Sequence, residues 1–229
     1  MIMAKADAIA ANSAYLARYA SQNNSNAADV GQGCEVGDFL NAPAHKPTDI
    51  AGIGYPIIGY VGSITSTRLD IKLVQYIAST RKDWNIVLVG PADDNFKNSG
   101  LTQMENVHFL GPKPQQELAS YVHAFDVCFN PQLLNQMTIG NYPRKVDEYL
   151  AAGKPVVATK TETMEMFGEN AFLCDTAEEY IIAIEQALQE QHVPEKVAAR
   201  VAMGKAHTWQ ASVEKIYSLI NDTINGNRK

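Results

Sequence analysis

The chain has 229 residues, of which 46% are hydrophobic and 19% charged, and its formal net charge is −6 at pH 7. This composition excludes intrinsic disorder, collagen and coiled coil, and the length allows one sizeable core. No stretch approaches the roughly 20 apolar residues of a membrane span. The first residues do not form a signal peptide, and the acidic balance gives no footprint for nucleic acid. We therefore expect a cytoplasmic protein.

The first 50 residues differ from the rest of the chain. Residues 7–12 predict a short strand, and Ser13 is placed to cap a helix over 14–20. Residues 21–39 are polar and rich in turn formers, and 41–56 carry several Pro and Gly, which indicates a linker. We expect the chain to divide into residues 1–50 and residues 51–229.

From Pro56 onward, short apolar runs alternate with helical patterns. Strands are predicted over 56–61, 85–90, 107–111, 126–130, 155–159 and 171–174. Helices are predicted over 69–80, 114–123, 143–152, 176–188 and 209–225. Strands that are apolar on both faces and separated by helices are typical of a parallel sheet covered on both sides. The pattern predicts a doubly wound, Rossmann-like α/β fold.

The last predicted helix has one apolar stripe, formed by Trp209, Val213, Ile216, Tyr217, Ile220 and Ile224. Both tryptophans are interpreted as packing anchors. Cys34, Cys128 and Cys174 lie far apart with no CxxC spacing, so they are expected to be reduced thiols. The five histidines are scattered and show no metal-ligand spacing, so we expect no metal.

In a doubly wound sheet, ligands bind beyond the carboxyl ends of the strands. The first such loop begins with Gly62 and Ser63 and ends at Arg68. It matches neither GxGxxG nor a P-loop. Its backbone N–H groups could approach an anion, and Arg68 adds a fixed positive charge. The alternative is a plain loop with a surface arginine.

A second candidate is the segment 135–159. Pro143 suits the first turn of a helix, and Asn141 is then a plausible cap. The N–H groups beside Gly140 would face the sheet's carboxyl edge, where a helix N-terminus favours anions. Lys145 adds a full charge within the first turn.

The same predicted helix separates two faces. Val146, Tyr149 and Leu150 form the core stripe, whereas Lys145 and Glu148 lie toward the strand ends. A carboxylate in this position can accept hydrogen bonds from a sugar diol. The alternative is a surface ion pair worth a few tenths of a kcal/mol. Asp93 and Asp94 are interpreted as a solvated turn.

The order of these motifs resembles the C-terminal, donor-binding half of a GT-B glycosyltransferase of family 4 (group 1). The resemblance covers about residues 50–225 and rests on IIGYVGSI, RKDWNIVLVGPAD, NVHFLGPKP, NYPRKVDEYLAAGKPVVAT and the final Trp-led helix. Residues 4–40 are similar to the last elements of the N-terminal acceptor domain and the start of the interdomain linker. The rest of that domain is missing from this sequence.

The resemblance implies a nucleoside diphosphate sugar, of the UDP or GDP type, as donor. It places Gly62 and Ser63 near the donor phosphates and Arg68 on the diphosphate. It also implies that backbone groups of Phe109, Leu110 and Gly111 bind the nucleotide base.

Glu148 matches the second acid of the family's E-x7-E motif, which usually binds ribose, but Gly140 replaces the first acid. Asn141, Pro143 and Lys145 fit an Asn-x-Pro-x-Lys variant. That variant implies Lys145 on the diphosphate and N–H donors at Asn141 and Tyr142. The missing acid normally contacts the transferred sugar, so that contact stays open. Whether the anomeric configuration is retained or inverted also stays open.

Catalysis in such a site would be electrostatic, with cations stabilising the leaving diphosphate. No catalytic residue is assigned, because the acceptor-side groups are expected in the missing domain. The full-length protein could associate with a membrane surface.

Three alternatives stay open. A nucleotide-sugar 2-epimerase of the same architecture needs acid–base residues that the sequence does not show. An isolated nucleotide-binding module would bind donor and transfer nothing. A flavodoxin-like receiver needs an acid cluster at the strand ends, which Asp93 and Asp94 alone do not supply.

Overall fold

Six parallel strands form the central sheet in the computed structural model, which describes residues 2–226. Their order across the sheet is β5-β4-β3-β6-β7-β8. The strands are β3 (Ile57–Val61), β4 (Asn85–Val89), β5 (Val107–Gly111), β6 (Val127–Asn130), β7 (Val156–Thr159) and β8 (Ala171–Cys174). The chain builds the sheet outward from β3 to β5 on one side and from β6 to β8 on the other. The connections on the two sides of the β3–β6 pair therefore run in opposite directions, which creates a crevice at the carboxyl ends of these two strands.

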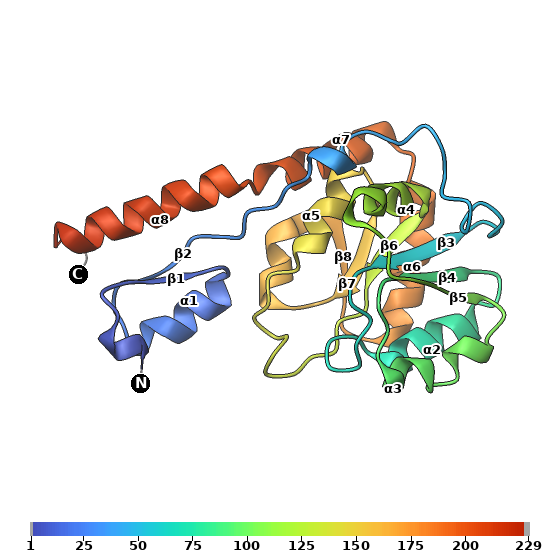
Figure 1. Cartoon of the computed structure of the whole chain (residues 1–229), viewed down its shortest axis with the longest axis horizontal. Helices are drawn as coiled ribbons and strands as arrows, with labels where there is room; N and C mark the ends of the chain where they lie inside the picture. Colours follow the sequence, from blue (N-terminus) through green and yellow to red (C-terminus); the bar gives the residue numbers. More distant parts are fainter. Residues whose placement is uncertain (1, 227–229) are drawn as a thin grey trace.

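Helices cover both faces of this sheet (Figure 1). They are α2 (Ile71–Thr80), α3 (Asp94–Lys97), α4 (Leu118–Ala124), α5 (Arg144–Ala151), α6 (Ala177–Glu190) and α7 (Pro194–Ala206). Short 3-10 segments lie at η3 (Leu101–Gln103), η4 (Gln115–Glu117) and η5 (Glu162–Asn170). The expected doubly wound, Rossmann-like fold is confirmed.

Two apolar cores lie on opposite faces of the sheet. One core joins α4 and α5, and the other joins α2, α3 and α6. Side chains of β3 alternate between them, with Ile57 and Val61 in the first and Ile58 and Tyr60 in the second. Gly59 leaves room for the Phe125 ring, because a Cβ there would lie 2.1 Å from a ring carbon. The sheet is thus buried on both sides, as its apolar strands predict.

The N-terminal residues form a small separate unit, with η1 (Met3–Lys5), β1 (Ile9–Ala11), α1 (Ala14–Ser21) and β2 (Ala27–Asp29). β1 and β2 pair in parallel, and the Ser13 hydroxyl accepts a hydrogen bond from the Leu16 N–H, which confirms the predicted cap. The following segment, with η2 (Gly37–Phe39), runs over the main body, where Phe39 and Ile50 are buried in the first core.

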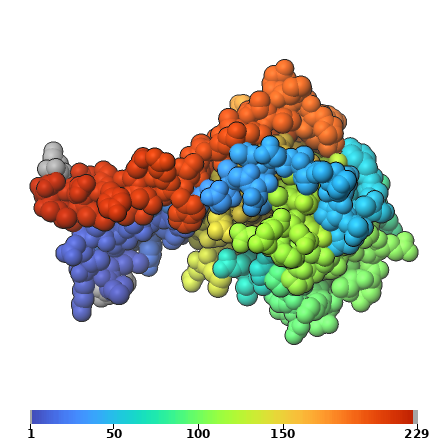
Figure 2. Space-filling view, turned by 45° about the horizontal axis from the view of Figure 1, so that its top comes forward, coloured from blue at the N-terminus to red at the C-terminus, as the bar shows by residue number. Residues whose placement is uncertain are grey.

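The C-terminal helix α8 (Trp209–Ile224) extends away from the body and runs beside the N-terminal unit (Figures 1 and 2). Its predicted apolar stripe is largely exposed: the exposed fraction is 64% for Tyr217 and 76% for Ile224. Helix α7 was not predicted. Its first turn carries Pro194, but only Arg200 and Gly204 along it are buried, so it lacks an apolar stripe.

Cys34, Cys128 and Cys174 are all buried and free, as expected. Within residues 2–226, no helix combines the length and apolarity that crossing a membrane requires.

Candidate functional site

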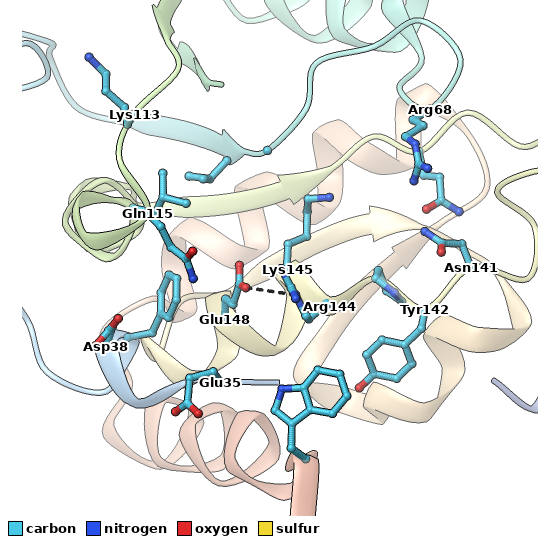
Figure 3. Close-up of a pocket in the computed structure, with 17 residues that line it drawn as sticks. Glu35, Asp38, Arg68, Lys113, Gln115, Asn141, Tyr142, Arg144, Lys145 and Glu148 are labelled. Atoms are coloured by element: carbon cyan, nitrogen blue, oxygen red, sulfur yellow. Dashed lines mark ion pairs between the residues drawn. The ribbon is translucent and has the colours of Figure 1, made fainter. Parts of the chain in front are cut away.

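A cavity of about 530 Å³ opens at the carboxyl ends of the central strands (Figure 3). Its walls come from the ends of β3 and β5, the loop after β6, the start of α5, the segment 35–39 and the first residue of α8. Its lining comprises Glu35, Asp38, Phe39, Val61, Gly62, Arg68, Lys113, Gln115, Leu118, Gln132, Asn141, Tyr142, Pro143, Arg144, Lys145, Glu148 and Trp209.

The end of β3 is shaped by Gly62, whose φ is +144°, a conformation that side chains disfavour. A Cβ on Gly62 would lie 3.1 Å from Lys145 Cε. Lys145 therefore lies across the strand end, with its Nζ 4.9 Å from the centroid of the Tyr60 ring. The Gly62 N–H donates to the Val89 carbonyl at 2.9 Å, so this N–H is part of the sheet rather than a free donor.

Asp93 holds the loop that follows Gly62. Its Oδ2 accepts hydrogen bonds from the Ser66 N–H at 2.7 Å and from the Ser66 hydroxyl at 2.9 Å. Its Oδ1 accepts from the Phe96 N–H and caps α3. Burial by itself would raise the pKa of Asp93, but these donors lower it below its usual value. Asp93 is thus a loop anchor rather than the solvated turn that the sequence indicated.

Arg68 ends this loop and reaches the cavity. The Leu133 N–H donates to the Arg68 carbonyl at 2.8 Å, which ties the loop to the segment after β6. In the part of the chain that the structure describes, neither Arg68 nor Lys145 forms an ion pair with a carboxylate. Both cations are therefore available to an anionic ligand.

The start of α5 differs by one position from the sequence expectation. Pro143 precedes the first helical residue, Arg144, and no side chain caps the helix, so Asn141 is not the cap. The Asn141 N–H donates to the Thr138 carbonyl at 3.0 Å, which occupies it within the preceding turn.

The two faces of α5 are as predicted. Val146, Tyr149 and Leu150 are fully buried in the core, and Lys145 and Glu148 line the cavity. Burial raises the pKa of the Glu148 carboxyl, with the positive charges of Arg144 and Lys145 opposing the rise. The ion pair that Glu148 forms is with Arg144, at 3.6 Å, rather than with Lys145.

Five candidate residues do not line this cavity: Ser63, Phe109, Leu110, Gly111 and Gly140. Phe109 and Gly111 line a separate hollow of about 330 Å³ beyond β5. Gly140 lies under Tyr15 of α1, because a Cβ there would be 2.2 Å from the tyrosine ring. The Gly140 carbonyl also accepts a hydrogen bond from the Ser13 hydroxyl at 2.8 Å. Gly140 thus serves as a contact with the N-terminal unit.

Several cavity residues were not among the site residues predicted from the sequence. Glu35, Asp38 and Phe39 lie in a segment that reads as a polar connection, and their approach to α5 is a long-range contact. Trp209 is half exposed at the cavity edge and packs on Gly33, where a Cβ would lie 2.3 Å from its indole. Lys113 and Gln115 follow β5 directly, so their place at the carboxyl end of a strand could have identified them.

A family model described as "Glycosyl transferases group 1" matches residues 55–190, which is more than half of the chain. The chain belongs to this family. The family resemblance given by the sequence motifs is thereby confirmed. The matched residues contain the sheet, the loop from Gly62 to Arg68 and the helix with Lys145 and Glu148.

Among curated proteins, this chain is 29% identical over 167 residues to TuaH of Bacillus subtilis (strain 168), described as a teichuronic acid biosynthesis glycosyltransferase. The match covers 69% of this chain and 41% of TuaH. Crystal structures with the same fold include Anabaena HepE in complex with UDP, at TM-score 0.75 and 17% identity over 95% of this chain and 64% of HepE.

Sucrose-phosphate synthase from Thermosynechococcus elongatus also shares the fold, at TM-score 0.71 and 22% identity, over 98% of this chain and 60% of that one. The chain thus spans about two fifths of TuaH and less than two thirds of these two solved chains.

Proposed function

We propose that the cavity binds the nucleoside diphosphate part of a sugar donor, and that the chain contributes this donor site to a glycosyltransferase. The observation that carries the proposal is the pairing of two cations with one half-buried carboxylate around the same cavity. Arg68 and Lys145 reach it without a carboxylate partner in residues 2–226, and Glu148 lies one helical turn beyond Lys145.

The diphosphate is assigned to Lys145 and Arg68. A phosphate oxygen is a strong acceptor, and both side chains carry a charge that persists at neutral pH. Negative charge grows on the diphosphate as the glycosidic bond breaks, so these cations would stabilise the transition state more than the bound donor. No chemical step is assigned to a metal ion or to another cofactor.

The ribose is assigned to Glu148, whose carboxylate can accept two hydrogen bonds from a diol. Phe109, Leu110 and Gly111 stay a prediction for the backbone near the base, because they lie outside the cavity in this structure. HepE has been crystallised with UDP and with UDP-glucose, which supports a nucleoside diphosphate sugar as the donor class. UDP is therefore the first ligand to test, followed by GDP.

Transfer itself needs an acceptor site, which we assign to a further domain of the full-length protein. Closure of that domain over the cavity would exclude water, which otherwise hydrolyses the donor. The description of TuaH supports polysaccharide biosynthesis as the setting.

The proposal is tested by calorimetric titration of the chain with UDP, GDP and ADP, each beside its nucleoside. We expect one diphosphate to bind at least about tenfold more tightly than its nucleoside, because one charge-assisted contact is worth about 1.5–3 kcal/mol. Lys145→Ala should remove most of that difference. Lys82→Ala, an exposed lysine before the amino end of β4, is the matched control. Equal binding of diphosphate and nucleoside by the unaltered chain would contradict the proposal.

A further inference from the structure

A fully buried carboxylate lies directly behind the candidate donor site. Asp147 belongs to α5, between Lys145 and Glu148, but its side chain has no solvent exposure and does not line the cavity. Its Oδ1 lies 2.7 Å from His207 Nδ1, and its Oδ2 accepts a hydrogen bond from the Tyr142 hydroxyl at 2.8 Å. Both carboxylate oxygens are therefore occupied by side chains from other segments.

The two partners of Asp147 come from different segments that border the cavity. Tyr142 lies in the loop that leads into α5, and it lines the cavity itself. His207 follows α7 and lies two residues before Trp209, which also lines the cavity. The His207 carbonyl accepts a hydrogen bond from the Cys34 N–H at 3.0 Å. The wall segment 35–39, which follows Cys34, is therefore attached beside His207.

Aromatic packing makes this cluster rigid. The rings of Tyr142 and His207 meet edge to face with centroids 6.1 Å apart, and Phe167 meets His207 in the same way at 5.8 Å. A shift of the imidazole therefore displaces the Tyr142 ring as well as the carboxylate.

A buried carboxylate is destabilising unless it is paired and hydrogen-bonded, and removing one partner leaves an uncompensated buried charge. Burial raises the pKa of Asp147, while the hydrogen bonds from His207 and Tyr142 and the charge of His207 oppose that rise. The charged form of Asp147 is thus most favourable when His207 carries a proton.

We propose that Asp147 and His207 are a positioning pair for the donor site, which holds the Tyr142 loop and the start of α8 in the geometry that binds the diphosphate. The inference rests on the proposed function, since it concerns affinity for the same ligand. Without the imidazole, Asp147 would keep only the Tyr142 hydroxyl as a partner, and the Tyr142 loop and the start of α8 would no longer be held at one point. Donor affinity would then decrease.

Burial raises the pKa of the Tyr142 hydroxyl and raises that of the Cys34 thiol to about 12, so both groups beside the pair are neutral near pH 7. The other charges that act on Tyr142 and Cys34 come from β2, residues 35–39 and α5: Asp29, Glu35, Arg144 and Glu148.

The test is the dissociation constant of UDP, or of GDP if UDP does not bind, measured beside that of the nucleoside. His207→Ala removes the imidazole from Asp147. Its affinity for the diphosphate should be about fivefold or more below that of the unaltered chain, the lower end of typical coupling energies, while its affinity for the nucleoside stays equal. His207→Gln keeps a hydrogen-bond donor and should restore most of the loss, which a general loss of stability would not predict.

Tyr142→Phe is the second variant, because it keeps the Asp147–His207 contact and removes only the link to the loop. It should show the same selective loss of diphosphate affinity, and it provides the test if His207→Ala does not fold. His192→Gln, an exposed histidine between α6 and α7, should follow the unaltered chain throughout. Unchanged diphosphate affinity in both variants, or an equal loss for diphosphate and nucleoside, would overturn the positioning role. Absence of nucleoside diphosphate binding by the unaltered chain would instead refute the proposed function.

Discussion

Lys145 lies across Gly62, with only the space of a missing side chain between them: a Cβ on Gly62 would be 3.1 Å from Lys145 Cε. The positive φ of Gly62 and the course of Lys145 are therefore two parts of one arrangement. The glycine ends the strand without filling the cavity, and the lysine uses that room to reach the ligand side.

Gly62→Ala is expected to weaken diphosphate binding and to lower the free energy of unfolding by about 1–3 kcal/mol, because the backbone is strained and Lys145 is displaced. Gly168→Ala separates the two effects. Gly168 also has a positive φ, +53°, but a Cβ there meets nothing within 4 Å. Calorimetry and thermal unfolding of both variants check this. Unchanged binding by Gly62→Ala would show that the position of Lys145 does not matter.

Glu148→Gln is expected to weaken binding of ribonucleoside diphosphates several-fold more than that of their 2′-deoxy analogues, because an amide accepts fewer hydrogen bonds from a diol. The measurement is a pair of titrations for each protein. Glu105→Gln, an exposed glutamate just before the amino end of β5, is the control. An equal loss for both sugars would remove the ribose assignment.

The same carboxyl predicts a pH response at the acidic side. Since burial raises the pKa of Glu148 above 4.5, protonation occurs at a higher pH than for a free glutamate. The raised pKa also means that the folded chain binds this proton more tightly than the unfolded chain, so its contribution to stability decreases as the pH rises through that window. Ribonucleotide affinity should fall as the pH drops through the raised pKa, and Glu148→Gln should not show this component. Titrations between pH 4.5 and 7 measure it, and an identical slope in both proteins would contradict it.

Asp93→Ala is expected to release the loop that carries Arg68. We predict a lower melting temperature and weaker diphosphate binding, because the Ser66 N–H loses its acceptor and α3 loses its cap. Since the pKa of Asp93 is lowered in the folded chain, its contribution to stability is present above pH 4 and is lost as the pH falls through the lowered value. Asp94→Ala, its 91% exposed neighbour, should leave melting and binding unchanged.

Ser13→Ala is expected to destabilise the N-terminal unit by about 1 kcal/mol, the typical value of a helix cap. The hydroxyl both caps α1 and donates to the Gly140 carbonyl. Urea unfolding measures the change, with Ser21→Ala, an exposed serine at the end of the same helix, as control. Diphosphate binding should persist, since Gly140 does not line the cavity.

The sheet could be predicted from the sequence because each strand is a short apolar run with its own turn signals. Residues 57–61, 85–89 and 107–111 form strands within one residue of expectation. The faces of α5 were likewise predicted by spacing alone. Helix α7 was missed because buried Arg200 donates to the carbonyls of Gly153 and Glu190, an anchoring that no periodic apolar pattern reveals.

The candidate site was predictable only where one segment carries its own chemistry. Lys145 and Glu148 share a helix, so local spacing places them together. Gly140 could not be placed correctly, because the residue that covers it, Tyr15, is 125 positions earlier in the chain. The link from Asp147 to His207 spans 60 residues and has no local signal either.

The cavity has a fixed floor and an attached rim. Lys145 and Glu148 belong to a helix packed into the core, whereas Glu35, Asp38 and Trp209 lie near the points where the chain crosses from the N-terminal unit and where α8 leaves toward it. A rotation of the N-terminal unit about these two crossings would therefore move the rim relative to the floor and change the width of the entrance.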